Sequence, residues 1–208
     1  MPNAAYRPRA GIRALRARDA RFAALLAAVG PVAIPQRPST FETIARSIAY
    51  QQLTGKAART IWERVLRHFD GRGFTPERVL RTRIDTLRAA GLSRAKAESL
   101  KDLARHVAEG HLDPVGLRDL DDETVTAQLV RVRGIGPWSA HMHLIFALAR
   151  PDVWPTGDLG VRKGLQRFLD LPAVPDAKEA ARLGEAWAPW RTIVAWTMWR
   201  IHDLEGWD

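Results

Sequence analysis

Length and composition already exclude several classes of protein. The 208 residues are enough for one substantial hydrophobic core or two small lobes, and 46% hydrophobic with 26% charged residues is typical of a globular protein in water. The chain has no cysteine, which excludes disulfides, thiolate zinc sites and cysteine-held iron–sulfur clusters.

An excess of positive charge indicates a polyanionic partner. Thirty-two Lys and Arg residues outnumber 23 Asp and Glu residues, so the net charge is +9. Arginine matches phosphate geometry, which favours nucleic acid, although a GC-rich genome that inflates arginine would give the same composition. No apolar run approaches the roughly 18–20 residues of a membrane helix, and no signal-peptide pattern opens the chain. We therefore expect a cytoplasmic, nucleoid-associated protein with no membrane partner.

Helical periodicity recurs along the chain, and no stretch shows the alternation of a strand. Residues 1–9 are basic and contain proline, so we expect them to be poorly ordered. Ser39 and Glu42 have the spacing of a capping box. Asp121 or Asp122 and then Asp176 are the N-caps predicted further on. The chain is therefore predicted to be all-α, with helices that include residues 11–29, 39–53, 84–90, 158–169 and 189–204.

A Gly-Ile-Gly turn joins two of these helices. Gly134 and Gly136 flank one apolar residue, as expected for a tight turn that needs positive φ or close approach of the backbone. Pro137 suits the first position of the next helix, where its missing N–H has no partner to lose. The first amides of that helix are unpaired, and the glycines leave room for an anion beside them. The turn therefore predicts a phosphate-binding site.

Four motifs follow one another in the chain: SIAYQQLTGKAA at 47–58, GIGPWSA at 134–140, PTGDLGVRKG at 155–164 and WAPWRTIVAWTMWR at 187–200. Together they resemble the HhH-GPD superfamily of DNA glycosylases, over about residues 40–205. The nearest branch is 3-methyladenine DNA glycosylase II, in its short yeast-like form. The resemblance implies an all-α fold without an N-terminal sheet domain, and an active-site cleft between two lobes. These lobes are residues 1–39 with 155–208, and residues 40–154, which include the helix-hairpin-helix at about 125–149.

Asp158 is the candidate catalytic residue. A carboxylate can stabilise the positive charge that develops on a sugar when its N-glycosidic bond breaks, and it can orient or deprotonate the attacking water. Asp158 is also well placed to cap the helix that follows, and position alone favours that structural role. Its motif matches the catalytic aspartate of the family, and the two roles are compatible.

The resemblance implies an aromatic base pocket that includes Trp138, Trp199, Tyr50 and Met142. Trp138 stands where bifunctional members carry a nucleophilic lysine, which implies a monofunctional enzyme without lyase activity. Its indole could stack on a cationic methylated purine, although Trp138 could equally begin a core stripe. Trp199 could line a cleft or pack in a core. Met142 departs from the tyrosine of the bacterial pattern, as Arg200 departs from an aromatic residue.

The same resemblance implies a set of DNA contacts. Leu53 matches the wedge that fills the gap left by an extruded base, with Gln52 beside it. Without the motif, these residues would read as an ordinary helix end. The other implied DNA contacts are Lys96, Gly134, Gly136, Ser139 and Thr156. A structural sodium or potassium ion on the carbonyls of Val130, Val132 and Ile135 is also implied, and no cofactor is required.

The resulting hypothesis is a monomeric DNA glycosylase that removes 3-methyladenine- or 7-methylguanine-type bases from duplex DNA. One alternative is a non-catalytic helix-hairpin-helix module that only binds DNA, which would need neither Asp158 nor the two tryptophans. Another is a glycosylase of a different HhH-GPD branch, acting on other damaged bases. The absence of cluster cysteines argues against that second alternative.

Overall fold

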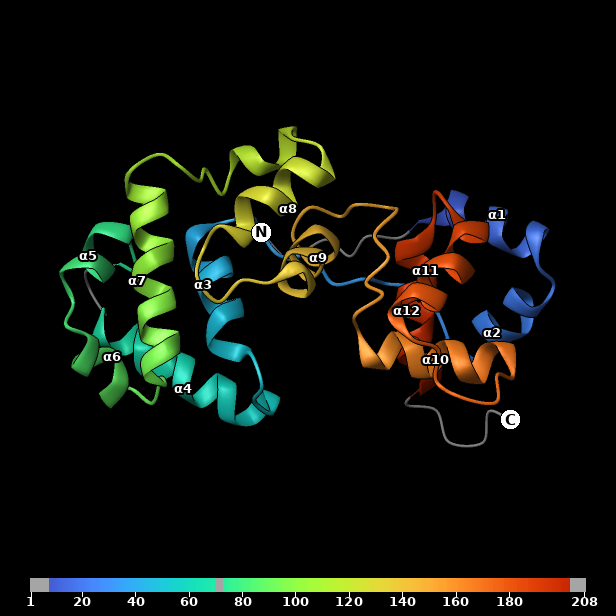
Figure 1. Cartoon of the computed structure of the whole chain (residues 1–208), viewed down its shortest axis with the longest axis horizontal. Coiled ribbons are helices and arrows are strands. Elements are labelled where there is room, and N and C mark those ends of the chain that lie inside the picture. The colour runs from blue at the N-terminus through green and yellow to red at the C-terminus, as the bar shows by residue number, and fades with distance from the viewer. Residues whose placement is uncertain (1–7, 70–72, 203–208) are drawn as a thin grey trace. The chain divides into compact units, whose positions relative to one another are not determined.

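The computed structural model describes residues 8–69 and 73–202, and every regular element in these ranges is helical (Figure 1). The prediction of an all-α chain is confirmed. Poor order is predicted for residues 1–9, of which 1–7 lie outside the described residues; for the last two the prediction is wrong, since Pro8 is the N-cap of the first helix and Arg9 begins it. The predicted end of the last helix at Leu204 also lies outside the described residues. Within the described ranges, none of the helices combines the length and apolar character that a membrane span requires.

The chain packs as two compact units. One, which we call the terminal unit, contains the described residues up to Gln36 and those from Leu144 onward; the other, the hairpin unit, is Arg37–His143. The sequence predicts the equivalent boundaries at residues 39 and 154. The second boundary falls earlier because the segment around Asp152 is hydrogen-bonded to the last helix of the terminal unit.

The terminal unit is built from helices at both ends of the chain. It contains α1 (Arg9–Arg18), α2 (Arg21–Val29), α10 (Leu159–Leu169), α11 (Ala177–Gly184), the 3-10 turn η2 (Glu185–Trp187) and α12 (Arg191–His202). Helix α12 packs against both α10 and α2. The crossing of α10 and α12 is close because Gly164 has no side chain: a Cβ there would collide with the backbone carbonyl of Met198. Phe22, Phe168 and Trp187 form the aromatic core of this unit.

The hairpin unit is centred on one long helix. It contains α3 (Phe41–Tyr50), α4 (Gly55–His68), α5 (Pro76–Arg81), α6 (Ile84–Ala89), α7 (Arg94–Ala108), the 3-10 turn η1 (Gly116–Asp119), α8 (Asp122–Val130) and most of α9 (Pro137–Phe146). Helix α7 has α5 and α6 on one flank and α3 on the other (Figure 1). Ala97, Leu100 and Leu103 of α7 are fully buried there.

Two local predictions are wrong. The predicted helix over residues 11–29 is two helices, because Asp19 is extended and accepts hydrogen bonds from both the backbone N–H and the guanidinium of Arg21. The N-cap of α3 is Thr40, whose hydroxyl accepts from the backbone N–H of Thr43 at 3.2 Å. Ser39 is instead buried and bonded to His143 and to the carbonyl of Pro114. The predicted caps Asp121 and Asp176 are confirmed.

Candidate active site and nucleic-acid interface

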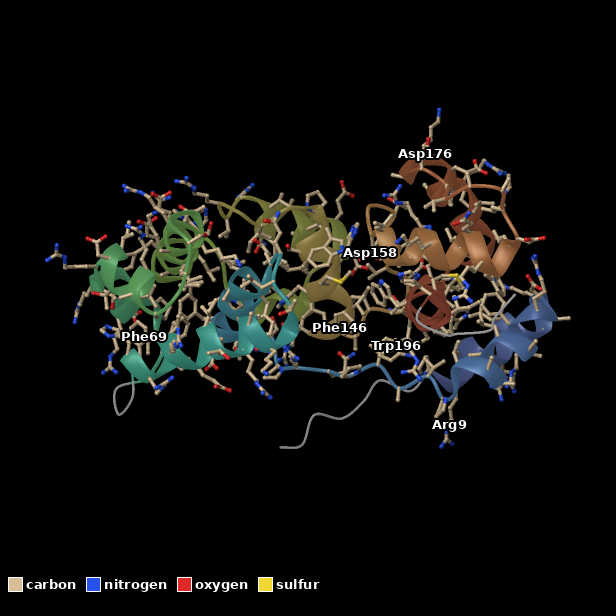
Figure 2. The ribbon with its side chains drawn as sticks, turned by 90° about the horizontal axis from the view of Figure 1, so that it is seen from below. Arg9, Phe69, Phe146, Asp158, Asp176 and Trp196 are labelled. Atoms are coloured by element: carbon tan, nitrogen blue, oxygen red, sulfur yellow. The ribbon has the colours of Figure 1, made fainter. Side chains whose placement is uncertain are left out.

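Asp158 immediately precedes α10 and is its N-cap (Figure 2). Its Oδ1 accepts the backbone N–H of Val161 at 2.9 Å, so it satisfies one of the amides that a helix start leaves unpaired. Its own N–H donates to the carbonyl of Pro155 at 2.9 Å, which closes the turn before the helix. The carboxylate is half-buried. Asp158 therefore caps α10 as expected, and its carboxylate remains partly accessible at the start of that helix.

A second donor reaches the same carboxylate oxygen. The indole Nε1–H of Trp199, on α12, donates to Asp158 Oδ1 at 2.8 Å. With the Val161 amide, two N–H donors from different helices fix the plane of the carboxylate. Gly160 makes room for this arrangement, since a Cβ there would lie 3.0 Å from Trp199 Cδ1 and 3.2 Å from Asp158 Oδ1.

Phe146, the last residue of α9, packs against the indole ring of Trp199. The two rings stack with centroids 5.9 Å apart and planes inclined by 22°. Phe146 is absent from the residues predicted for the site. Its only signal in the sequence is its place on the apolar face of the helix after the Gly-Ile-Gly turn. The terminal unit thus brings together Asp158, Trp199 and Phe146, two of them predicted.

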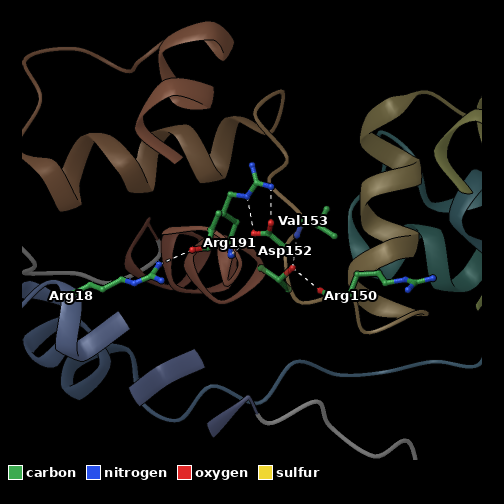
Figure 3. A network of polar contacts seen from close by, with 7 residues as sticks. Arg18, Arg150, Asp152, Val153 and Arg191 are labelled. Atoms are coloured by element: carbon green, nitrogen blue, oxygen red, sulfur yellow. Dashed lines mark hydrogen bonds and ion pairs between the residues drawn. The ribbon is translucent and has the colours of Figure 1, made fainter. Parts of the chain in front are cut away.

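The loop that leads to Asp158 is anchored on α12 (Figure 3). Asp152 forms a bidentate ion pair with Arg191, with both bonds at 2.7 Å. The hydroxyl of Thr192 accepts the N–H of Val153 at 2.9 Å and donates to the carbonyl of Arg150 at 2.7 Å. These bonds satisfy the backbone of the loop and attach it to the helix that carries Trp199. The loop that ends at Asp158 and the helix that carries Trp199 are therefore fixed to each other.

The hairpin unit contains the predicted phosphate site. The turn between α8 and α9 requires Gly134, which has φ of +79° and whose Cβ would collide with the side chain of Ser99. Arg133 pairs with Glu98 at 2.8 Å, and its N–H donates to Asp102 at 2.8 Å. The turn is thus held against α7. The predicted glycine requirement is confirmed at Gly134 but not at Gly136, which has no positive φ and has open space where a Cβ would lie.

The side chain of Gln51, at the end of α3, contacts this turn. Its Nε2 donates to the carbonyl of Gly134 at 2.9 Å and to Ser139 Oγ at 3.2 Å. Ser139, a predicted DNA contact, is 9% exposed. The sequence motif predicts roles for the neighbouring residues Tyr50, Gln52 and Leu53 but none for Gln51.

The residues around Gln51 differ in their surroundings. The Arg46 guanidinium lies 3.9 Å from the ring centroid of Tyr50, a cation–π contact that covers one face of this predicted pocket residue. Gln52 has φ of +54°, which is uncommon for a residue other than glycine. Leu53 follows it and is 40% exposed, which suits a wedge that must reach into a base stack.

Lys96 is oriented towards the protein. Its Nζ donates to the carbonyls of Ala49 at 2.9 Å and Gln51 at 2.6 Å, at the C-terminal end of α3. Partial burial lowers the pKa of Lys96 from its ordinary value. The family resemblance predicts that Lys96 contacts DNA. In the structure its ammonium group instead binds carbonyls at the end of α3.

The remaining predicted residues lie in both units. Trp138 is 45% exposed, which disfavours the alternative that it only begins a core stripe. Met142 and Thr156 are half-buried. Among the hairpin carbonyls, that of Val132 accepts the N–H of Ile135 at 3.0 Å. Within the described ranges, no group of three His, Cys, Asp or Glu residues is arranged to hold a metal ion.

A buried polar pair lies at the end of the hairpin unit. His143 Nε2 and Ser39 Oγ are 2.8 Å apart, and Ser39 donates its hydroxyl hydrogen to the carbonyl of Pro114. Ser39 Oγ must therefore accept from His143, so the Nε2–H tautomer is present. Burial lowers the pKa of His143 from 6.5 to about 4. The imidazole is consequently neutral at physiological pH.

Comparison with known proteins identifies the class. Residues 45–189 match the HhH-GPD superfamily of base excision DNA repair proteins, which is well over half of the chain. The protein therefore belongs to the HhH-GPD superfamily, as its motifs indicate. DNA-3-methyladenine glycosylase 1 of Schizosaccharomyces pombe is 33% identical to it over 171 residues, which are 81% of this chain and 75% of that protein.

Solved structures agree with this assignment. The DNA-3-methyladenine glycosidase of Bacillus halodurans superposes with a TM-score of 0.83 at 32% identity, over 93% of this chain and 89% of that one. The S. pombe 3-methyladenine DNA glycosylase, in complex with abasic DNA, gives a TM-score of 0.74 at 30% identity, over 91% of this chain and 94% of that one. The predicted fold is thereby confirmed.

Proposed function

We propose that the chain is a monofunctional DNA glycosylase that flips alkylated bases out of duplex DNA and excises them by hydrolysing the N-glycosidic bond. The observation that carries the proposal is the carboxylate of Asp158, held at the start of α10 by the Trp199 indole and the Val161 amide. A module that only binds DNA needs no such carboxylate. The names of the S. pombe and B. halodurans relatives support 3-methyladenine as a substrate, and the proposal extends this to 7-methylguanine-type bases, which also carry a positive charge.

The proposed catalytic role of Asp158 follows from the negative charge of its carboxylate. As the bond between C1′ and the base breaks, the electron pair leaves with the base and the sugar gains oxocarbenium character. A carboxylate nearby stabilises that charge and can orient the water that adds to C1′. The water adds hydroxide to C1′, and its proton passes to the Asp158 carboxylate or to solvent, because a cationic base leaves as a neutral molecule. Methylated purines with a positive charge are good leaving groups, so stabilising the sugar is the main task left to the protein.

The absence of lyase activity is a further part of the proposal. Strand cleavage by these enzymes requires an amine that attacks C1′ and forms a Schiff base. The family resemblance puts Trp138 at the position of that lysine, and an indole cannot form an imine. Its large exposed face is suited to stack on a cationic base. We expect an abasic product strand that remains intact.

DNA binding is assigned to the hairpin unit of a monomer. The amides at the start of α9, beside Gly134 and Gly136, would bind a backbone phosphate. A sodium or potassium ion could be held by carbonyls of Val130, Val132 and Ile135, where it would supply positive charge for that phosphate. These oxygens suit a monovalent cation, because Val130 ends α8 and its carbonyl has no intrahelical partner, while the Val132 carbonyl accepts the N–H of Ile135 and retains a second lone pair.

The test is base release from methylated duplex DNA by the wild type and by Asp158→Asn. Asparagine is also a good N-cap, so the variant should fold and bind DNA. We expect the wild type to release methylated purines without nicking the strand and the variant to lose this activity by more than about a hundredfold. Equal DNA binding with no release by either protein would favour the non-catalytic binding module, and release of oxidised or mismatched bases would favour another branch.

A further inference from the structure

The segment that carries the predicted wedge is bonded directly to the hairpin turn. Gln51 lies one residue before Gln52 and two before Leu53, and its Nε2 donates to Gly134 O at 2.9 Å and Ser139 Oγ at 3.2 Å. A carbonyl can only accept, so the amide must present its NH₂ group to Gly134. The side chain thus uses both of its N–H groups on the element assigned to phosphate binding.

The backbone of the same segment is held from another side. Lys96 Nζ donates to Gln51 O at 2.6 Å and to Ala49 O at 2.9 Å. The next residue, Gln52, has φ of +54°, a conformation that a residue with a Cβ keeps only when its surroundings impose it. Gln51 is therefore restrained through both its main chain and its side chain, immediately before the strained residue.

We infer that Gln51 is a positioning residue that couples the hairpin to Leu53 during base extrusion. The inference rests on the proposed function. To displace a base from the stack, the wedge residue must be held rigidly. It must also be anchored to a part of the protein that is bound to the same DNA. The hairpin is that part, since it holds the backbone phosphate, and the Gln51 side chain joins it to the segment that presents Leu53.

The inference predicts a selective defect for Gln51→Leu, which removes both donors at similar volume. Two duplexes would carry the same methylated purine, one opposite its normal partner and one opposite an abasic site, where extrusion is easier. On the paired duplex we expect single-turnover release to fall about tenfold, the factor that one or two ordinary hydrogen bonds provide. On the abasic-opposed duplex, we expect a change of less than about twofold.

A second readout follows extrusion without chemistry. In an Asp158→Asn background, 2-aminopurine beside the lesion should fluoresce on binding, and adding Gln51→Leu should lower that signal while DNA affinity stays within about twofold. Gln51→Glu keeps the length but removes the NH₂ donors, so it should reproduce the defect. Gln166→Leu, the same change at a half-buried glutamine of α10 outside the hairpin unit, is the matched control and should leave base release and the 2-aminopurine signal unchanged.

The outcomes separate the two proposals. Equal loss on both duplexes, or no loss on either, would overturn the coupling role of Gln51, as would an unchanged 2-aminopurine signal. Failure of the wild type to release any methylated base would overturn the proposed function instead, and the 2-aminopurine signal would then decide alone whether Gln51 assists extrusion.

Discussion

The indole N–H of Trp199 and the carboxylate of Asp158 meet at 2.8 Å, although 41 residues separate them in the chain. This bond joins α12 to the N-cap of α10. In the proposed mechanism it gives Trp199 a role other than stacking on the base, because a residue that orients the Asp158 carboxylate acts on the sugar.

Trp199→Phe keeps an aromatic ring but removes the N–H. We expect single-turnover base release to fall about tenfold or more, because a hydrogen bond to a charged group is lost, while DNA affinity changes little. The fall should be the same for 3-methyladenine and 7-methylguanine, since the sugar is common to both. Release from DNA that contains each base measures this.

Trp196→Phe is the matched control for that experiment. Trp196 is a half-buried tryptophan on the same helix, and its replacement should leave the rate unchanged. If Trp199→Phe affected the two bases by very different factors, contact with the base would explain its role better than orientation of Asp158.

Lys96→Met tests whether this lysine contacts DNA or caps α3. The structure predicts the second role, so we expect the free energy of unfolding to fall by about 1–3 kcal/mol as two carbonyls lose a charged donor. The slope of log binding constant against log salt concentration should not change. A residue that neutralises a phosphate would reduce that slope by about 0.9, which fluorescence anisotropy at several salt concentrations would reveal.

Stability should decrease in mild acid because of His143. Its pKa is about 4 in the folded protein and 6.5 without burial, so only the unfolded chain takes up the proton between these values. Stability is therefore complete above about pH 6.5 and falls by about 1.4 kcal/mol per pH unit between about pH 6.5 and pH 4. Burial also lowers the pKa of His141, which adds to the effect in the same direction.

Urea unfolding at pH 7.5 and at pH 5 measures this dependence. His143→Gln should be less stable than the wild type at pH 7.5 and should show a shallower loss on acidification. Retention of the full slope by the variant would assign the pH dependence to other groups.

Thr192→Val tests the anchor of the loop before Asp158. The hydroxyl is buried and bonds to Val153 N–H and Arg150 C=O, so its removal should cost about 1–3 kcal/mol of folding free energy. Thr197→Val is the control: Thr197 is equally buried on the same helix, but its hydroxyl bonds only within the helix, to Val194 O. Chemical denaturation should show the smaller loss for Thr197→Val.

Much of the fold was predictable because local signals determine it. Periodicity defines most helices, and one of the two glycines of the turn, Gly134, has the positive φ expected of it. Asp121 and Asp176 cap their helices as their spacing suggests. Ser39 was misassigned because Thr40 is an equally good N-cap, and the choice between them depends on a bond to His143, which is 104 residues away.

The candidate site was only partly predictable, for a related reason. Motifs locate Asp158 and Trp199, but no pattern in the sequence indicates that they bond to each other. The stacking of Phe146 and the two bonds of Gln51 depend on which elements pack together. Lys96 shows the converse: its motif suggests DNA, whereas the unpaired carbonyls at the end of α3 attract its ammonium group.

The close crossing at Gly164 has a consequence for genetics. No catalytic group lies at this position, yet any larger residue would push α10 away from the backbone of Met198, the neighbour of Trp199. In a screen for cells that lose resistance to methylating agents, alleles at Gly164 should resemble alleles at Asp158. They should differ in dosage: overproducing the protein should partly restore resistance to the Gly164 alleles, whose fault is a shifted helix, and never to those that lack the carboxylate.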